Sequence, residues 1–136
     1  MKSEAQEFVD LLRPFEEIRK AIEQTTADIF VSGSKGSLTA FSLARLFDEL
    51  NRTFLVITDT PDAALNVFNE LLFFRGGTEN SHAASSHPVF LFPALETHPY
   101  ENVASHPDVC GQRMWALYQL CTAHQPLIII TCIQAL

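Results

Sequence analysis

Basic side chains are scarce in this chain. Among its 136 residues, 9 are Lys or Arg and 16 are Asp or Glu, which gives a formal net charge of −7. The basic residues are scattered and form no cluster. Neutralising a nucleic-acid backbone requires clustered Lys and Arg, so the composition argues against nucleic-acid binding by this chain alone. An anionic membrane surface is disfavoured for the same reason.

Long hydrophobic runs are also absent. No apolar stretch approaches the ~20 residues of a membrane span. The N-terminal residues 1–8 have no apolar core of the kind found in secretory signals. We therefore expect a cytoplasmic protein without a membrane partner.

Cysteine and histidine occur without metal-binding spacing. The three cysteines are odd in number and show no CxxC pair, so neither a disulfide framework nor a zinc site is predicted. Cys110, Cys121 and Cys132 are predicted to be small hydrophobic residues of the core. None of the five histidines is paired at the i, i+4 spacing of a helical metal site, so we expect no metal.

Hydrophobic residues make up 47% of the chain and charged residues only 18%, a composition typical of a globular domain. The length fits one domain, residues 1–136, with a helical lead-in over 1–25 and a core over 26–136. Pro14 is expected to interrupt the lead-in, giving two short helices or one kinked helix. Because the chain ends a few residues past a predicted buried strand, we expect it to be an N-terminal fragment of a larger multidomain protein.

Strand-like and helix-like segments alternate along the core. Strands are predicted at 28–32, 53–58, 89–92 and 127–132, and helices at 38–50, from Pro61 to a stop at Gly76–Gly77, and at about 108–123. Strands that are apolar on nearly every residue are usually buried on both faces and pair in parallel. The predicted fold is therefore α/β, with three layers, a mostly parallel sheet and helices on both faces, as in P-loop NTPases.

The helix after the second predicted strand has clear boundary signals. Thr60 can cap its start, Pro61 suits its first position, and Asp62 favours the positive end of the helix dipole. Gly76 and the glycine after it allow a left-handed stop. Residues 77–87, which follow, are small and polar and are predicted to form a mobile surface loop.

A glycine loop follows the first predicted strand, where ligands of parallel sheets bind. Its residues are Gly33, Ser34, Lys35, Gly36 and Ser37. A phosphate loop reads GxxxxGK[ST], and in that register Phe30 takes the first Gly, Lys35 the second and Gly36 the Lys, while Ser37 keeps the hydroxyl. Without Lys at 36 no hydrolysis is expected and no residue is predicted to be catalytic. A structural glycine turn is the favoured interpretation, and anion binding by the following helix start is the alternative.

A longer motif lies downstream. Residues 92–108 read FPALETHPYENVASHPD, and 112–120 read QRMWALYQL. This stretch resembles the N-terminal region of bacterial transcription-repair coupling factors (Mfd), whose pattern is approximately FPxxExxPYExxSPHxDIxxxRLxxLYxL. The matching residues are Phe92, Pro93, Glu96, Pro99, Tyr100, Glu101, His106, Asp108, Arg113, Leu117 and Tyr118.

Two further segments resemble the same family. Residues 50–58 resemble its LNRPxLVVT pattern and residues 130–136 its VTSVQAL pattern. Thr53 departs from the common Pro and Ala104 from the common Ser, and residues 77–87 match nothing in the pattern. The resemblance covers nearly the whole chain after residue 25.

The resemblance implies a domain similar to the first domain of the excision-repair protein UvrB, with a degenerate phosphate loop in place of the intact one. The full-length protein would be a cytoplasmic, ATP-dependent DNA translocase, a hydrolase that displaces RNA polymerase stalled at DNA damage and recruits UvrA for nucleotide excision repair. ATP and Mg²⁺ would bind in the downstream motor. UvrA would be contacted mainly by the following domain, and RNA polymerase and double-stranded DNA by downstream domains.

For this chain itself the resemblance implies a non-catalytic scaffold without a cofactor, in contact with other domains of the same protein. Two alternatives stay open. One is a nucleotide-binding P-loop ATPase of the UvrB or helicase type, which would need Gly-Lys where the chain has Lys35-Gly36. The other is an unrelated doubly wound domain that binds a small metabolite at residues 33–37.

Overall fold

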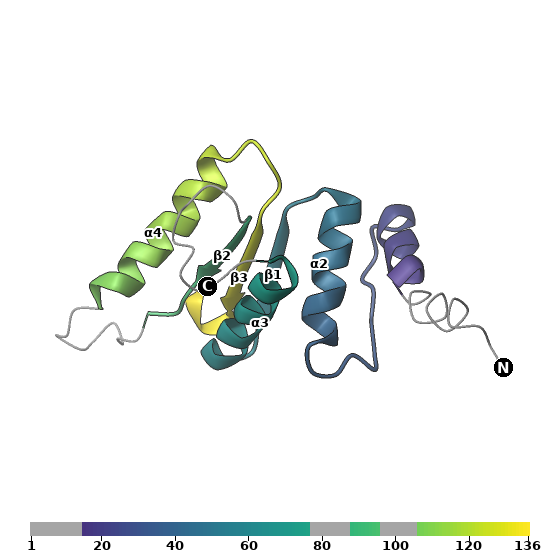
Figure 1. Cartoon of the computed structure of the whole chain (residues 1–136), viewed down its shortest axis with the longest axis horizontal. Coiled ribbons are helices and arrows are strands. Elements are labelled where there is room, and N and C mark those ends of the chain that lie inside the picture. The colour runs from purple at the N-terminus through teal and green to yellow at the C-terminus, as the bar shows by residue number, and fades with distance from the viewer. Residues whose placement is uncertain (1–14, 77–87, 96–105) are drawn as a thin grey trace.

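The computed structural model describes residues 15–76, 88–95 and 106–136. Residues 15–24 are helical and are followed by α2 (Leu38–Leu50), β1 (Phe54–Thr58), α3 (Pro61–Phe74), β2 (Val89–Phe92), α4 (Pro107–Thr122), β3 (Ile128–Cys132) and the short 3-10 helix η1 (Ile133–Ala135). Helices and strands alternate from α2 to β3, as predicted (Figure 1). Within the described residues, no helix is long and apolar enough to cross a membrane.

The strands form a parallel three-stranded sheet in the order β1-β3-β2. The connection through α3 runs from β1 past the position of β3 to β2. The connection through α4 runs in the opposite direction, from β2 to β3. Because such crossovers are right-handed, the two connections place α3 and α4 on opposite faces of the sheet. The α/β class and the parallel pairing are thus confirmed.

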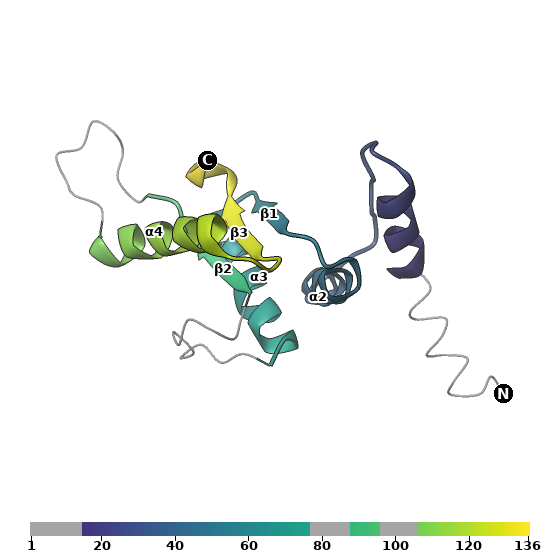
Figure 2. The same cartoon turned by 90° about the horizontal axis from the view of Figure 1, so that it is seen from above.

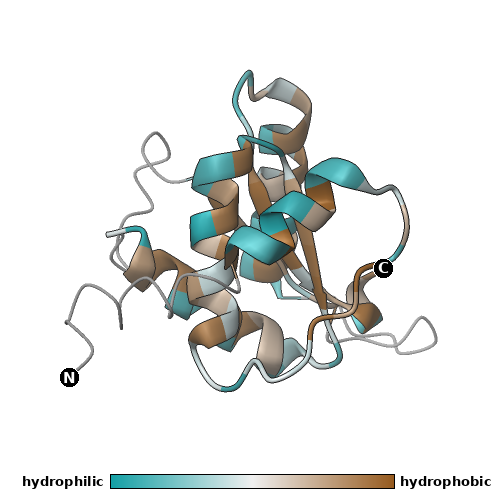
Figure 3. Cartoon of the chain, turned by 90° about the vertical axis from the view of Figure 1, so that its right-hand side faces the viewer, coloured by the Kyte–Doolittle hydropathy of each residue, from teal (hydrophilic) through white to brown (hydrophobic). Residues whose placement is uncertain are grey.

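The central strand β3 carries the core. Every residue of β3 is buried, and Ile128 and Ile130 are fully inaccessible. These two side chains share one hydrophobic cluster with Leu71 of α3 and Phe47 of α2, whereas Ile129 points to the other face and lies outside that cluster. In Figure 3 the strands are coloured as hydrophobic, and the helices in front of them carry both hydrophilic and hydrophobic residues.

The boundary signals of α3 are confirmed. The Thr60 hydroxyl accepts a hydrogen bond from the N–H of Ala63 at 3.2 Å, and Pro61 occupies the first turn with Asp62 beside it. At the other end Gly76 has a φ of +71°, a left-handed conformation that glycine adopts at no steric cost.

The prediction of a strand at 28–32 is wrong. These residues belong to no strand, and Phe30 is 94% exposed. An apolar run of this length becomes a strand only when a neighbouring strand satisfies its backbone N–H and C=O groups, and none of the described residues pairs with it. The observed sheet therefore has three of the four predicted strands.

The prediction that the 53–58 run is buried on both faces is also wrong. Phe54, Val56 and Thr58 are partly buried, but Leu55 is 59% exposed and Ile57 is 50% exposed. β1 is an edge strand, and α4 packs against β2 at the opposite edge. In the described part of the chain no helix covers the face of β1 that carries Leu55 and Ile57.

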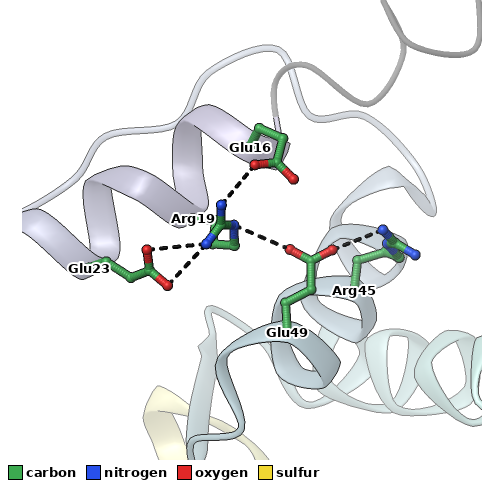
Figure 4. A network of polar contacts seen from close by, with 5 residues as sticks. All are labelled: Glu16, Arg19, Glu23, Arg45 and Glu49. Atoms are coloured by element: carbon green, nitrogen blue, oxygen red, sulfur yellow. Dashed lines mark hydrogen bonds and ion pairs between the residues drawn. The ribbon is translucent and has the colours of Figure 1, made fainter.

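The helix at 15–24 lies beyond α2 and is tied to it by charged side chains (Figures 1, 2 and 4). Arg19 contacts Glu16 at 2.9 Å and Glu23 at 3.1 Å within its own helix, and reaches Glu49 of α2 at 3.6 Å. Arg45 contacts the other oxygen of Glu49 at 2.9 Å. The hydrogen bond from Arg19, and then its charge, lower the pKa of the Glu16 carboxyl. Residues 1–14, including the predicted kink at Pro14, lie outside the described residues.

Candidate functional site

The glycine loop forms a tight turn before α2. Gly33 has a φ of +87° and Gly36 a φ of +55°, both left-handed. A Cβ added at either position would meet nothing within 4 Å, so glycine is required here by backbone conformation and not by lack of space. Since 28–32 is not a strand, the strand-loop-helix context of a phosphate loop is absent from this structure.

Ser37, the residue that matches the hydroxyl position of the phosphate-loop template, already takes part in a hydrogen bond. The Ser37 hydroxyl donates a hydrogen bond to Oε1 of Glu70 in α3 at 2.7 Å and makes no cap bond to its own helix. Nearby, the hydroxyls of Ser34 and Thr39 are 2.6 Å apart. The Glu70 carboxylate places a negative charge beside Ser37 at the start of α2, and such a charge opposes the attraction of the helix start for anions.

Phe92 and Pro93 of the motif meet a third motif residue, Arg113 of α4, at the carboxyl end of the sheet. Its guanidinium donates to the carbonyl oxygen of Pro93 at 2.6 Å and lies 3.4 Å from the carbonyl oxygen of Ala135. The same group stacks over the ring of Phe92, with 3.9 Å between the guanidinium carbon and the ring centroid. We call these four residues, Phe92, Pro93, Arg113 and Ala135, the Arg113 cluster.

Two threonines join the strands beside this cluster. The Thr131 hydroxyl of β3 donates to the carbonyl oxygen of Phe92 in β2 at 2.9 Å. The Thr58 hydroxyl of β1 lies 3.2 Å from the carbonyl oxygen of Thr131. These hydroxyls link the carboxyl ends of all three strands. Sequence reasoning missed them, although each of two predicted strands, 53–58 and 127–132, has a threonine at or near its end.

Two motif residues begin α4. His106 precedes the helix, and its Nδ1 accepts a hydrogen bond from the N–H of Asp108 at 3.3 Å. Asp108 lies in the first turn, where a carboxylate is favoured by the helix dipole. These contacts give both residues a role in starting the helix.

The remaining motif residues of α4 point outward. Leu117 is 45% exposed and Tyr118 is 57% exposed, and the Tyr118 ring stacks on that of Trp115 at 5.6 Å between centroids. The helix buries Ala116 instead. Both aromatic rings therefore lie outside the core. The motif residues Glu96, Pro99, Tyr100 and Glu101, and the predicted loop at 77–87, lie outside the described residues.

Metal ligands do not gather in the described residues. No group of three or more His, Cys, Asp or Glu side chains there could hold a metal ion. Cys132 is buried, as predicted, but Cys110 and Cys121 are exposed, so the core prediction is wrong for those two. Both lie on α4, which buries mainly the face that carries Ala116.

The chain is an α/β domain built on a parallel sheet, and the Arg113 cluster lies at the carboxyl ends of its strands. We compared the chain with protein-family models, curated proteins and solved structures, and none of the three comparisons found a match.

Proposed function

We propose that this chain is a non-catalytic, UvrB-like scaffold module of a transcription-repair coupling factor. The observation that carries the proposal is the Arg113 cluster. Three segments that resemble the family, at 92–93, 113 and 130–136, come from distant parts of the sequence and meet there through one guanidinium. Its polar partners are main-chain carbonyls, which hold chain segments together but supply no nucleophile, acid or base. The motif is therefore architectural in this proposal.

The glycine loop supports the non-catalytic part of the proposal. Ser37 is bonded to a carboxylate, and Gly36 supplies no amine for a transferring phosphoryl group. The left-handed glycines that lead into α2 favour the alternative, a P-loop ATPase of the UvrB type, because they resemble a phosphate-binding turn. The charge of Glu70 beside Ser37 supports the scaffold.

In this proposal the chain contacts other domains of the same protein. The exposed Trp115–Tyr118 stack supports such contacts, since aromatic side chains are enriched where proteins meet. The full-length protein would displace stalled RNA polymerase by ATP-driven translocation on double-stranded DNA. It would recruit UvrA mainly through the following domain.

Calorimetric titration with Mg-ATP tests the catalytic question. We expect no saturable heat and no phosphate release from the chain. The matched variant Glu70→Gln removes the opposing charge and leaves the shape of the loop, and it too should fail to hydrolyse ATP because residue 36 remains Gly. Micromolar binding with turnover in the unmodified chain would establish the ATPase alternative.

Capture of purified UvrA tests the partner assignment. We expect this chain alone to retain little or no UvrA, because the principal contact is assigned to the following domain. A version extended through that domain should retain UvrA. Robust capture by residues 1–136 alone would contradict the assignment.

A further inference from the structure

An open cavity of about 860 Å³ lies at the amino-terminal edge of the sheet. This volume is within the range of small-molecule sites, about 300–1,000 Å³. Its walls are the ends of α2 and α4, Arg75 just after α3, the start of β2, and residues 123–127, which lead into β3. The upper ends of α2 and α4 in Figure 1 mark this edge. The glycine loop precedes α2 and therefore lies at that helix's other end.

The helix ends give this cavity a negative field. Each helix precedes a strand and runs antiparallel to it, so Asn51, Arg75 and Ala123 bring three carboxyl-terminal helix ends to the cavity wall. The carboxyl end of a helix carries roughly half a negative charge. None of the three helices has a basic residue in its last turn to offset it. Asp48 adds a full negative charge at the wall.

One cation of the protein already lies in this field. The Arg75 guanidinium pairs with Asp48 and stacks over the ring of Phe47 at 4.9 Å from its centroid. The Arg75 side chain is only 18% exposed, and its Nε has no hydrogen-bond partner in the described residues. Because Arg75 and Asp48 cancel in formal charge, the partial charges of the helix ends leave the described wall with a net negative field.

We propose that this cavity binds an organic cation, an ammonium or guanidinium group on an apolar stem. Phe90 and Leu127 offer apolar surface to the stem. The side-chain carbonyls of Gln119 and Gln125, together with the helix-end carbonyls, offer acceptors to the charged group. An anion is disfavoured, because Arg75, the one Lys or Arg among the described wall residues, is paired with Asp48, and the helix ends repel negative charge. The same chemistry is present in a free amine and in an arginine side chain of a partner protein.

The test is a titration of the isotope-labelled chain, followed through the backbone amide signals of the cavity wall. The probe is n-butylguanidinium, and its matched control is n-butylurea, which has the same shape and no charge. We expect shifts at Gln119, His124 and Gln125, with n-butylurea at least 10-fold weaker and butyrate without effect. Equal binding of n-butylurea, or preferred binding of butyrate, would overturn the proposal.

A pair of variants places the site. Gln119→Lys puts a competing ammonium on the cavity wall and should weaken n-butylguanidinium binding at least 10-fold. Gln112→Lys makes the same charge change on an exposed position of the same helix and should leave binding within 2-fold. If Gln119→Lys does not fold, His124→Lys serves the same purpose. Equal affinity in the two lysine variants would refute the site.

N-acetylargininamide separates the two sources of the cation. Tighter binding of this compound than of n-butylguanidinium assigns the cavity to an arginine side chain of a partner. The reverse order assigns it to a free small-molecule cation. Either order supports an organic-cation site, and binding of neither compound refutes it. This result is independent of ATP and UvrA binding, so it stands or falls separately from the scaffold function.

Discussion

Replacing Arg113 by Ala is the sharpest perturbation of the fold. This side chain connects α4 to the segment after β2 and to η1, and no other described side chain makes the same three contacts. Arg113→Ala would leave the Pro93 carbonyl without its charged donor and uncover the ring of Phe92. We expect a large loss of stability from a residue that is only partly buried.

The magnitude follows from the contacts. A hydrogen bond from a charged donor contributes about 1.5–3 kcal/mol, and a cation–π contact about 0.5–2 kcal/mol. The contacts to Ala135 are long at 3.4 Å and add little. The free energy of unfolding should therefore fall by about 2–5 kcal/mol, a large part of the total of about 5–15 kcal/mol for a domain. The corresponding fall in Tm is roughly 10 °C.

Urea unfolding followed by circular dichroism measures this change. An unchanged slope of the transition shows that the folded and unfolded states of the variant are as compact as those of the unmodified chain. The matched control is Arg45→Ala. Arg45 is 48% exposed and makes one i, i+4 ion pair with Glu49, so its loss should cost no more than about 0.5 kcal/mol. If the two alanine variants lose stability equally, Arg113 is an ordinary surface residue and the architectural interpretation of the motif fails.

Two further predictions concern the glycines and the N-terminal network. Gly36→Ala should lower the free energy of unfolding by about 1 kcal/mol, because φ there is +55°. Gly111→Ala should raise it by about 0.5–1 kcal/mol, because Gly111 lies inside α4 with open space around it. Thermal unfolding of both variants measures these opposite changes. The pKa of Glu16 is lowered in the folded chain, so its contribution is present above the unfolded pKa and is lost as pH falls through the folded one. Glu16→Gln should therefore flatten the acid side of the stability profile at low salt, and an unchanged profile would show that the contact with Arg19 contributes nothing.

The elements predicted well are those whose signals are local. The start of α3 depends on Thr60 and Pro61, which act on the next few residues, and both boundaries of that helix are as predicted. The run at 28–32 has equally good local character but failed as a strand, because a strand depends on partners elsewhere in the chain. The exposure of one face of β1 also depends on distant parts of the chain. Whether a helix covers Leu55 is decided by the order of the strands and not by the sequence around it.

In the candidate site too, features set by neighbouring residues could be predicted, and features set by distant residues could not. The mismatch with the phosphate-loop template at position 36 was readable from the loop itself. The carboxylate at Ser37, in contrast, comes from Glu70, 33 residues away, and no pattern in either segment points to the other. The sequence showed the residues of the motif around Arg113, but it did not show which groups the Arg113 guanidinium contacts. An arginine in a motif serves equally well to bind a ligand anion or to tie main-chain carbonyls, and only the acceptors tell the two roles apart. Here the acceptors are the carbonyls of Pro93 and Ala135, so the charge of Arg113 is used within the fold and is not offered to a ligand.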